Sequence, residues 1–276
     1  MGKVADNRAT MAGPTPLELL EVAHEATAAA CAAIEPHWRR GAAARNKPDG
    51  SPVTDADVEA ERAIRAVIAR HYPAHAVYGE ELGHQEGHDA TRSEFLWLVD
   101  PIDGTKSFVR RYEMFSVQVC VWRAGVAQAA VSAAPWFGES AWAARGAGAF
   151  LKDADGVQRL AVSTVATLER AALSTGNLRT LASGAGWPAF GRLVAKVDRI
   201  RGYGDFWHYH LLAKGSIDAV IESDLNILDV AALALIVEEA GGKVTTLAGT
   251  PLALDSRDLL ASNGALHHAL LTALHQ

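Results

Sequence analysis

The 276-residue chain has two cysteines and no long apolar or basic runs. Cys31 and Cys120 lie far apart in apolar surroundings, so neither a disulfide framework nor a cysteine-rich metal site is expected, and free thiols fit a reducing compartment. No stretch reaches the roughly 20 uninterrupted apolar residues of a membrane span, and the first residues lack the apolar segment of a secretory signal. We therefore expect a cytoplasmic protein with a frayed N-terminus.

Excess positive charge is absent as well. The formal net charge is −6 and the pI is near 6.0, and no Lys or Arg run suggests nucleic-acid binding. Apolar residues make up 49% of the chain, which is enough for one large α/β domain or two closely packed ones.

The first half combines helical and strand patterns. A capping box at Thr15 and Glu18 predicts a helix that runs to about Trp38, and a second helix is predicted from Thr54 to about His71, after a loop. Short strands are predicted at 76–78, 95–99, 115–122, 126–133 and 139–144. These strands indicate an antiparallel or mixed sheet.

The second half alternates strands and helices. Strands are predicted at 171–175, 199–203, 219–221 and 243–246, and helices at 188–197, 205–214 and 229–240, with a closing strand and helix from Leu259. Helices are expected to stop at Gly215 and Gly241. The polar stretch 151–158 is a candidate boundary, so we expect halves 1–150 and 151–276 within one compact unit.

The most informative segment is an apolar strand that ends on Asp100 and is followed three residues later by Asp103. Two carboxylates at the end of one strand can converge on Mg²⁺, which prefers hard oxygen ligands. Gly104 and Thr105 can offer backbone N–H groups to a phosphate. Taken alone, this spacing is more often a solvated turn.

Two further acidic clusters strengthen the interpretation. Glu80 and Glu81 directly follow a predicted strand, and Asp229 stands at the start of an apolar helix. Singly, the first pair is typical of a charged loop and Asp229 of a helix cap. A mildly acidic protein that bound phosphate would also need local positive charge, which favours a metal.

The order of these clusters resembles the inositol monophosphatase family of lithium-sensitive, Mg²⁺-dependent phosphatases. The matching motifs are Glu80-Glu81, Asp100-Pro101-Ile102-Asp103-Gly104-Thr105, Leu228-Asp229-Val230-Ala231-Ala232 and Glu239-Ala240-Gly241-Gly242. Leu228 stands where the family usually has Trp, but the Asp that follows in the motif, Asp229, is present. The resemblance implies a layered αβαβα sandwich of mixed α+β and α/β character.

The resemblance also implies roles for individual residues. Two or three Mg²⁺ ions would be held by Glu80, Asp100, Asp103, Asp229 and the carbonyl of Ile102. Glu80 and Thr105 would activate the attacking water, and Asp57 would accept a hydrogen bond from the Thr105 hydroxyl. Asp57 is otherwise a first-turn helix acid. No side-chain nucleophile is expected, since metal-activated water serves for phosphomonoesters.

The leaving group is expected to meet Asp205 and Glu222. Gly104 and Thr105 would bind the phosphate, while two carboxylates near the leaving group favour a cationic alcohol. A closer resemblance to the histidinol-phosphate phosphatase branch rests on Asp103 to Phe108, Trp142 to Phe150 and Gly204-Asp205. Asp205 is otherwise a helix cap. Alternatives left open are an inositol-1-phosphate or sugar-phosphate phosphatase, a 3′-phosphonucleotide phosphatase and a non-catalytic binding protein.

The eleven histidines contain no spacing typical of zinc sites. His84, His88, His208 and His210 are therefore expected to be surface or polar packing residues. The expected partner is a small-molecule phosphomonoester, with no nucleic acid and no membrane, and we expect a homodimer.

Overall fold

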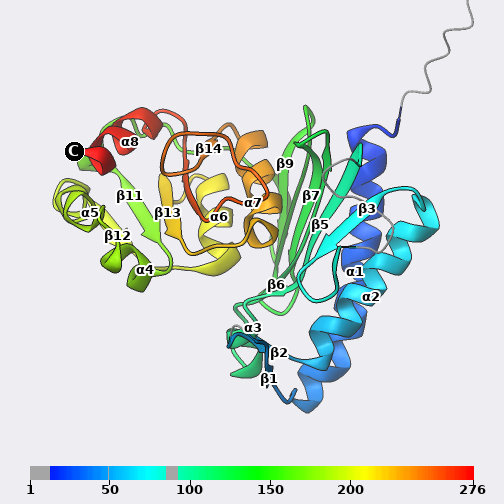
Figure 1. Cartoon of the computed structure of the whole chain (residues 1–276). Coiled ribbons are helices and arrows are strands. Elements are labelled where there is room, and N and C mark those ends of the chain that lie inside the picture. The colour runs from blue at the N-terminus through cyan, green and yellow to red at the C-terminus, as the bar shows by residue number, and fades with distance from the viewer. Residues whose placement is uncertain (1–12, 49, 85–92) are drawn as a thin grey trace, which may run out of the picture.

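The computed structural model describes residues 13–48, 50–84 and 93–276, and arranges them in five layers (Figure 1). Helices α1 and α2 cover one face of an eight-stranded sheet, and α6 and α7 lie between that sheet and a five-stranded sheet. Helices α4, α5 and α8 lie on the far side of the second sheet. This confirms the predicted αβαβα sandwich.

Two of the helices begin at the predicted caps. Thr15 and Glu18 form a reciprocal capping box at α1, and Thr54 and Asp57 form another at α2. The α-helices are α1 Pro16–Arg40, α2 Asp55–His71, α3 Thr105–Val109, α4 Leu178–Ser183, α5 Trp187–Val194, α6 Asp205–Ala213, α7 Ile227–Glu239 and α8 His267–His275, and Leu168–Arg170 is a 3₁₀ turn. Gly215 and Gly241 have φ of 74° and 94°, as expected for helix stops.

The larger sheet has the strand order β10-β9-β8-β7-β6-β5-β3-β4. Its strands are β3 Ala76–Gly79, β4 Gly83–His84, β5 Phe95–Asp103, β6 Ser116–Arg123, β7 Val126–Ala134, β8 Glu139–Ala144, β9 Gly148–Asp153 and β10 Gly156–Arg159. Neighbouring strands are antiparallel except for β3 and β5. A separate short hairpin joins β1 Arg45–Asn46 to β2 Pro52–Val53.

The smaller sheet has the order β12-β11-β13-β15-β14. Its strands are β11 Ala172–Thr175, β12 Arg199–Arg201, β13 Ala219–Ser223, β14 Lys243–Thr245 and β15 Asp258–Ser262. Parallel pairing of β11 with β12 and β13 gives way to antiparallel pairing at β15. The carboxyl end of β13 carries Glu222, so this sheet brings a carboxylate toward the middle helices.

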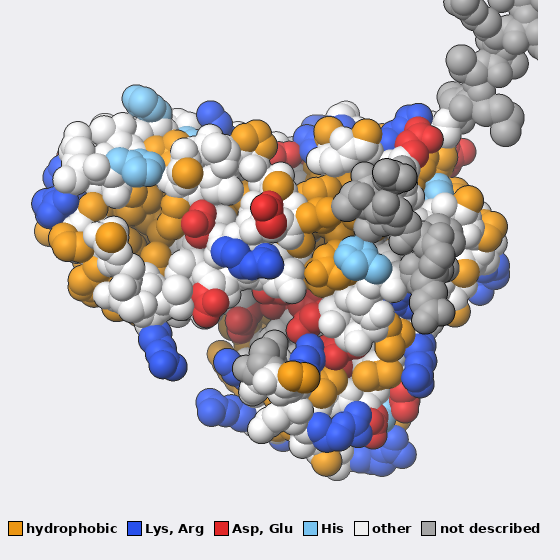
Figure 2. All heavy atoms as spheres, viewed as in Figure 1, with side chains coloured by type: hydrophobic (Ala, Val, Ile, Leu, Met, Phe, Trp, Pro, Cys, Tyr) orange, Lys and Arg blue, Asp and Glu red, His pale blue; other side chains and the backbone are white. Residues whose placement is uncertain are grey.

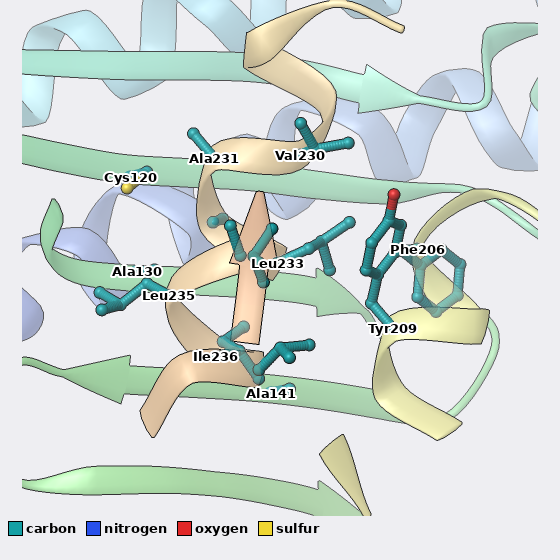
Figure 3. Packing of buried hydrophobic residues seen from close by; sticks show 14 of the residues in the cluster. Cys120, Ala130, Ala141, Phe206, Tyr209, Val230, Ala231, Leu233, Leu235 and Ile236 are labelled. Carbon is teal, nitrogen blue, oxygen red and sulfur yellow. The ribbon is translucent and has the colours of Figure 1, made fainter. Parts of the chain in front are cut away.

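The central helix α7 is apolar on nearly all sides because both sheets enclose it. Figure 3 shows Leu235 and Ile236 of α7 among Ala130 and Ala141 of the larger sheet, with Tyr209 of α6 alongside. A helix that is buried all round has few polar positions, and those that remain demand an explanation. Asp229 in its first turn is one of them.

Three local expectations need correction. The strand that leads to the acidic segment does not end at Asp100, because β5 continues through a bulge to Asp103. Helix α7 begins at Ile227 rather than Asp229, because Asn226 is its N-cap. The polar stretch 151–158 is a β9–β10 hairpin that extends the larger sheet, and the division at residue 150 stays a prediction. Within the described residues, no helix has the length and apolar character to cross a membrane.

Candidate active site

The β5 bulge places two carboxylates at the end of a buried strand. Asp100 Oδ1 accepts a hydrogen bond of 3.0 Å from the Ile102 backbone N–H, which folds the bulge around that side chain. Asp103 lies opposite Ser116 on β6 and accepts a hydrogen bond of 3.3 Å from the Ser116 hydroxyl. Asp100 is only 2% exposed. The bulge thus directs carboxylate oxygens and the Ile102 carbonyl to one end of the sheet.

Glu80 follows β3, the neighbour of β5, and its carboxylate forms an ion pair with Lys47. Its carboxylate lies 2.8 Å from the Lys47 ammonium, which also lies 2.7 Å from Glu81. Burial disfavours the ammonium charge, but the two carboxylates outweigh it and raise the pKa of Lys47. The turn that follows β3 is held by the fully buried Glu61, which accepts hydrogen bonds from the backbone N–H groups of Glu81 and Leu82.

Asp229 reaches the site from the first turn of α7. Asn226 caps the helix through its side chain, and Asp229 Oδ2 accepts a hydrogen bond of 3.1 Å from the Asn226 backbone N–H. The N-cap of α7 is therefore Asn226 and not Asp229, which is the third helical residue of the capping box, and the Asp229 carboxyl also interacts with the other acids.

The four carboxyls interact although they come from three separate parts of the chain, namely the residue after β3, strand β5 and helix α7. Burial, and then the charges of Glu80, Asp229 and Asp103, raise the pKa of Asp100 well above its usual range. Asp100 is within hydrogen-bonding reach of both Glu80 and Asp229. Burial, together with the nearby charges of Glu80 and Glu222, raises the pKa of Asp229 to about 7. Such mutual repulsion between buried acids is typical of functional sites.

This donor set fits a hard divalent cation by its chemistry. Over residues 13–48, 50–84 and 93–276, no group of three or more His, Cys, Asp and Glu side chains has the arrangement of a ready-made metal centre. Carboxylate and carbonyl oxygens are nevertheless the ligands that Mg²⁺ takes. Burial and then mutual repulsion raise the pKa values of Asp100, Asp103 and Asp229, and a bound cation would offset both by favouring the ionised carboxylates.

Thr105 and Asp57 lie together, as predicted. The Thr105 hydroxyl is 3.2 Å from Asp57 Oδ1 and 3.1 Å from the Ile102 carbonyl. The other Asp57 oxygen accepts hydrogen bonds from the Thr54 hydroxyl and backbone N–H, so Asp57 is a helix cap as well. Burial raises the pKa of Asp57. Gly104 precedes Thr105 with φ of 91°, a left-handed conformation that favours glycine.

Asp205 and Glu222 border the same cleft as two of the predicted ligands. The cleft is lined by Asp103, Asn177, Asp205, Tyr209, Glu222, Leu225, Asp229, Val230 and Leu233. Asp205 begins α6 with φ of 44°, a left-handed conformation that non-glycine residues seldom adopt. Burial raises the pKa of the Asp205 carboxyl.

Glu222 keeps its charge despite its burial. Tyr209 donates a hydrogen bond of 2.6 Å to Glu222 Oε2, and His208 Nε2 lies 3.4 Å from the same oxygen. Burial on its own would raise the pKa of Glu222, but the contacts of His208 and Tyr209 outweigh it and lower that pKa. An ionised carboxylate therefore lines the same cleft as Asp103 and Asp229.

Acidic side chains gather in a recess near the centre of the face in Figure 2, with Lys and Arg side chains around it. A larger cavity of about 470 Å³ lies elsewhere, between Trp122 and Leu252. Among its described lining residues, Asp255 is the one carboxylate. The predicted site residues Asp103, Asp205, Glu222 and Asp229 therefore line the acidic cleft and not this larger cavity.

Sequence reasoning missed several residues that shape this site. Lys47 stands in a predicted loop, which gives no sign of a role, and Glu61 lies one helical turn after Asp57, a spacing that places both on one face of α2. Tyr209 and Asn177 had no recognisable signal. His208 and His210 are fully buried polar packing residues, His84 is exposed, and His88 lies outside the described residues.

Comparisons with known proteins agree with this geometry. The model of the family described as "Inositol monophosphatase family" matches residues 16–276. A histidinol-phosphatase of Mycobacterium tuberculosis is 40% identical over 83% of this chain and 86% of its own length, and one of Streptomyces coelicolor is 38% identical over 95% and 99%. The solved inositol monophosphatase of Anabaena superposes with a TM-score of 0.79 at 30% identity, over 94% of this chain and 96% of its own.

Proposed function

Because the chain belongs to the inositol monophosphatase family and is a phosphoric monoester hydrolase, we propose that it hydrolyses L-histidinol phosphate to L-histidinol and phosphate with the aid of Mg²⁺. The observation that carries the proposal is the ionised Glu222 beside Asp205, in the cleft that Asp103 and Asp229 also line. An anionic pocket next to a phosphate site suits an ester whose alcohol is a cation.

The carboxylates of Glu80, Asp100, Asp103 and Asp229, with the Ile102 carbonyl, would hold two or three Mg²⁺ ions. Bound there, the ions would supply charge neutralisation for the phosphate and leaving oxygen and would favour ionisation of water. In this proposal the protein supplies the positions of these oxygens. Asp100 and Asp103 come from one bulge, and Glu80 and Asp229 approach from β3 and α7.

Thr105 and Asp57 would orient the attacking water. When the Thr105 hydroxyl donates its proton to Asp57 Oδ1, 3.2 Å away, its lone pairs remain able to accept a hydrogen bond from water. Glu80 is the carboxylate that would take the water's proton, and the backbone N–H groups of Gly104 and Thr105 would bind a phosphate oxygen. This arrangement requires no phosphoryl-enzyme.

The leaving alcohol would lie between Asp205 and Glu222. Histidinol carries an amine and an imidazole, and either can donate a charge-assisted hydrogen bond to a carboxylate. Asp205 is held in a left-handed backbone conformation at the edge of the cleft, which is the kind of strain that functional sites retain. The relatives named as histidinol-phosphatases support this choice over inositol 1-phosphate.

The substitutions Asp205→Asn and Glu222→Gln test the substrate assignment. Each removes a charge-assisted hydrogen bond worth about 1.5–3 kcal/mol, which corresponds to a roughly ten- to hundredfold loss of kcat/KM for histidinol phosphate. Hydrolysis of inositol 1-phosphate, whose alcohol is neutral, should fall much less. The measurement is phosphate release from both esters at saturating Mg²⁺.

The contrast between substrates separates specificity from general damage. Asp103→Asn is the matched control, because the loss of a proposed cation ligand should depress both activities together. Equal losses of both activities in Asp205→Asn and Glu222→Gln would refute the histidinol assignment. We also propose a homodimer in the cytoplasm, for which sedimentation and cell fractionation are the tests.

A further inference from the structure

A row of polar side chains crosses a sheet face that is otherwise apolar. Ser116 and Gln118 of β6, Ser132 of β7 and Glu139 of β8 lie on the face that packs against α6 and α7. Cys120, Ala130 and Ala141 share this face and contact α7 in Figure 3. Gln118 is paired directly with Ser132 in the strand register. The polar row therefore runs across adjacent strands.

Hydrogen bonds join this row from end to end. The Gln118 amide donates to the Ser116 hydroxyl at 2.7 Å and to the Ser132 hydroxyl at 3.1 Å. Ser116 in turn donates to Asp103 Oδ2. At the other end, His210 of α6 lies 3.0 Å from the Ser132 hydroxyl through Nε2.

The same histidine connects the row to a charged pair. His210 Nδ1 lies 3.1 Å from Glu139 Oε2, and the Lys214 ammonium lies 3.0 Å from Glu139 Oε1. A neutral His210 that carries its proton on Nδ1 donates to Glu139 and accepts from Ser132. Every hydroxyl and amide proton in the row then has one acceptor.

The buried polar side chains of this row carry a free-energy cost that packing alone would not require. Ser116, Gln118, Ser132 and His210 are all 0% exposed, and Gln118 Oε1 has no hydrogen-bond partner among the described residues. Apolar side chains of similar volume would fill the same space without that penalty. The row also has one distinctive end point, the carboxylate of Asp103.

The row links the two parts of the acidic cleft. Asp103 lies at one end, and α6, whose first residue is Asp205, carries His210 at the other. Asp103 and Asp205 line the same cleft and interact electrostatically. The chain of hydrogen bonds therefore ties the position of a predicted cation ligand to that of a predicted substrate residue.

We propose that Gln118 and His210 are positioning residues that hold Asp103 for cation binding and hold the Asp205 helix at a fixed place beside it. This inference rests on the proposed function, since it assigns Asp103 to the cation and Asp205 to the alcohol. Hydrogen-bond partners of metal ligands act in this way by fixing the orientation of the ligand.

Gln118→Met and His210→Phe break the row with side chains of similar volume. Both variants should bind Mn²⁺ about tenfold more weakly than wild type by calorimetry, without substrate, at a temperature where all proteins are folded. In phosphate release with Mg²⁺, the cation concentration for half-maximal rate should rise by a similar factor. His210→Gln retains a donor and an acceptor and should recover most of the affinity.

The matched control is His267→Phe on α8. His267 is also buried and joins two hydroxyls, Ser262 at 2.8 Å and Thr245 at 3.0 Å, but neither belongs to the acidic cleft. This variant should lose thermal stability and keep wild-type Mn²⁺ affinity. If Gln118→Met and His210→Phe do the same, the row is structural and the proposal is wrong. If wild type itself binds no Mn²⁺, the proposed function fails and this inference fails with it.

Discussion

Replacement of Asp229 by Asn should stabilise the metal-free protein while it removes a proposed cation ligand. Burial, together with the charges of neighbouring acids in the folded protein, raises the pKa of the Asp229 carboxyl from its ordinary 3.8 to about 7. The amide keeps an oxygen that can accept the hydrogen bond from the Asn226 backbone N–H. The substitution therefore removes the repulsion and keeps the helix cap.

The size of the effect follows from that pKa. A rise from 3.8 to about 7 corresponds to a cost of about 4 kcal/mol in the folded state once the carboxyl is ionised. Because the folded pKa lies above the unfolded one, the cost is absent below about pH 4 and grows until about pH 7. The unfolding free energy of Asp229→Asn should therefore exceed that of wild type increasingly across this range, and by a constant amount above it.

Urea unfolding followed by circular dichroism in EDTA, at pH 5 and pH 8, measures this difference. Asp155→Asn in the exposed β9–β10 turn is the control and should leave the free energy of unfolding unchanged at both pH values. Addition of Mg²⁺ should stabilise wild type and not Asp229→Asn. If wild type is the more stable protein in EDTA at pH 8, burial and the neighbouring charges do not raise the pKa of Asp229 as described.

Substitutions at three further positions test individual contacts. Glu61→Ala removes the ion-pair partner of Arg65 and the acceptor for two backbone N–H groups. The free energy of unfolding, measured by thermal unfolding, should fall by about 3–5 kcal/mol. A Tm near that of wild type would contradict the stabilising role of Glu61. Gly176→Ala would place a Cβ atom 2.1 Å from Glu222 Oε1, so the Glu222 side chain would have to move. We expect a roughly tenfold lower kcat/KM for histidinol phosphate and an unchanged dependence of the rate on Mg²⁺. An unchanged kcat/KM would contradict the position of Glu222 beside Gly176. Thr105→Val should lower kcat about a hundredfold and Thr105→Ser should restore it, whereas an active valine variant would exclude the hydroxyl from catalysis.

Much of the fold was predictable because its signals are local. The capping boxes at Thr15 and Thr54 and the glycine stops at Gly215 and Gly241 depend on neighbouring residues alone. The β9–β10 hairpin is hard to predict because all four residues of the edge strand β10 are exposed, so that strand has no alternation of buried and exposed positions to detect.

The sequence predicts which carboxyls meet in the cleft, but it does not predict the residues that hold them in place. The order of Glu80, Asp100, Asp103 and Asp229 along the chain is a family pattern that can be read directly. The contacts of Glu61, Tyr209 and His210 are made with elements that are distant in sequence. The sequence alone does not show whether a histidine such as His210 is buried or exposed. Tertiary packing alone decides which of them reach the site.

The most direct test is the release of phosphate from L-histidinol phosphate and from inositol 1-phosphate by the wild-type protein, with Mg²⁺ and with EDTA. We expect a higher kcat/KM for histidinol phosphate and no turnover of either ester in EDTA. A preference for inositol 1-phosphate would contradict the assignment of Asp205 and Glu222 to a cationic alcohol. Turnover that persists in EDTA would contradict the assignment of the carboxylate cluster to Mg²⁺.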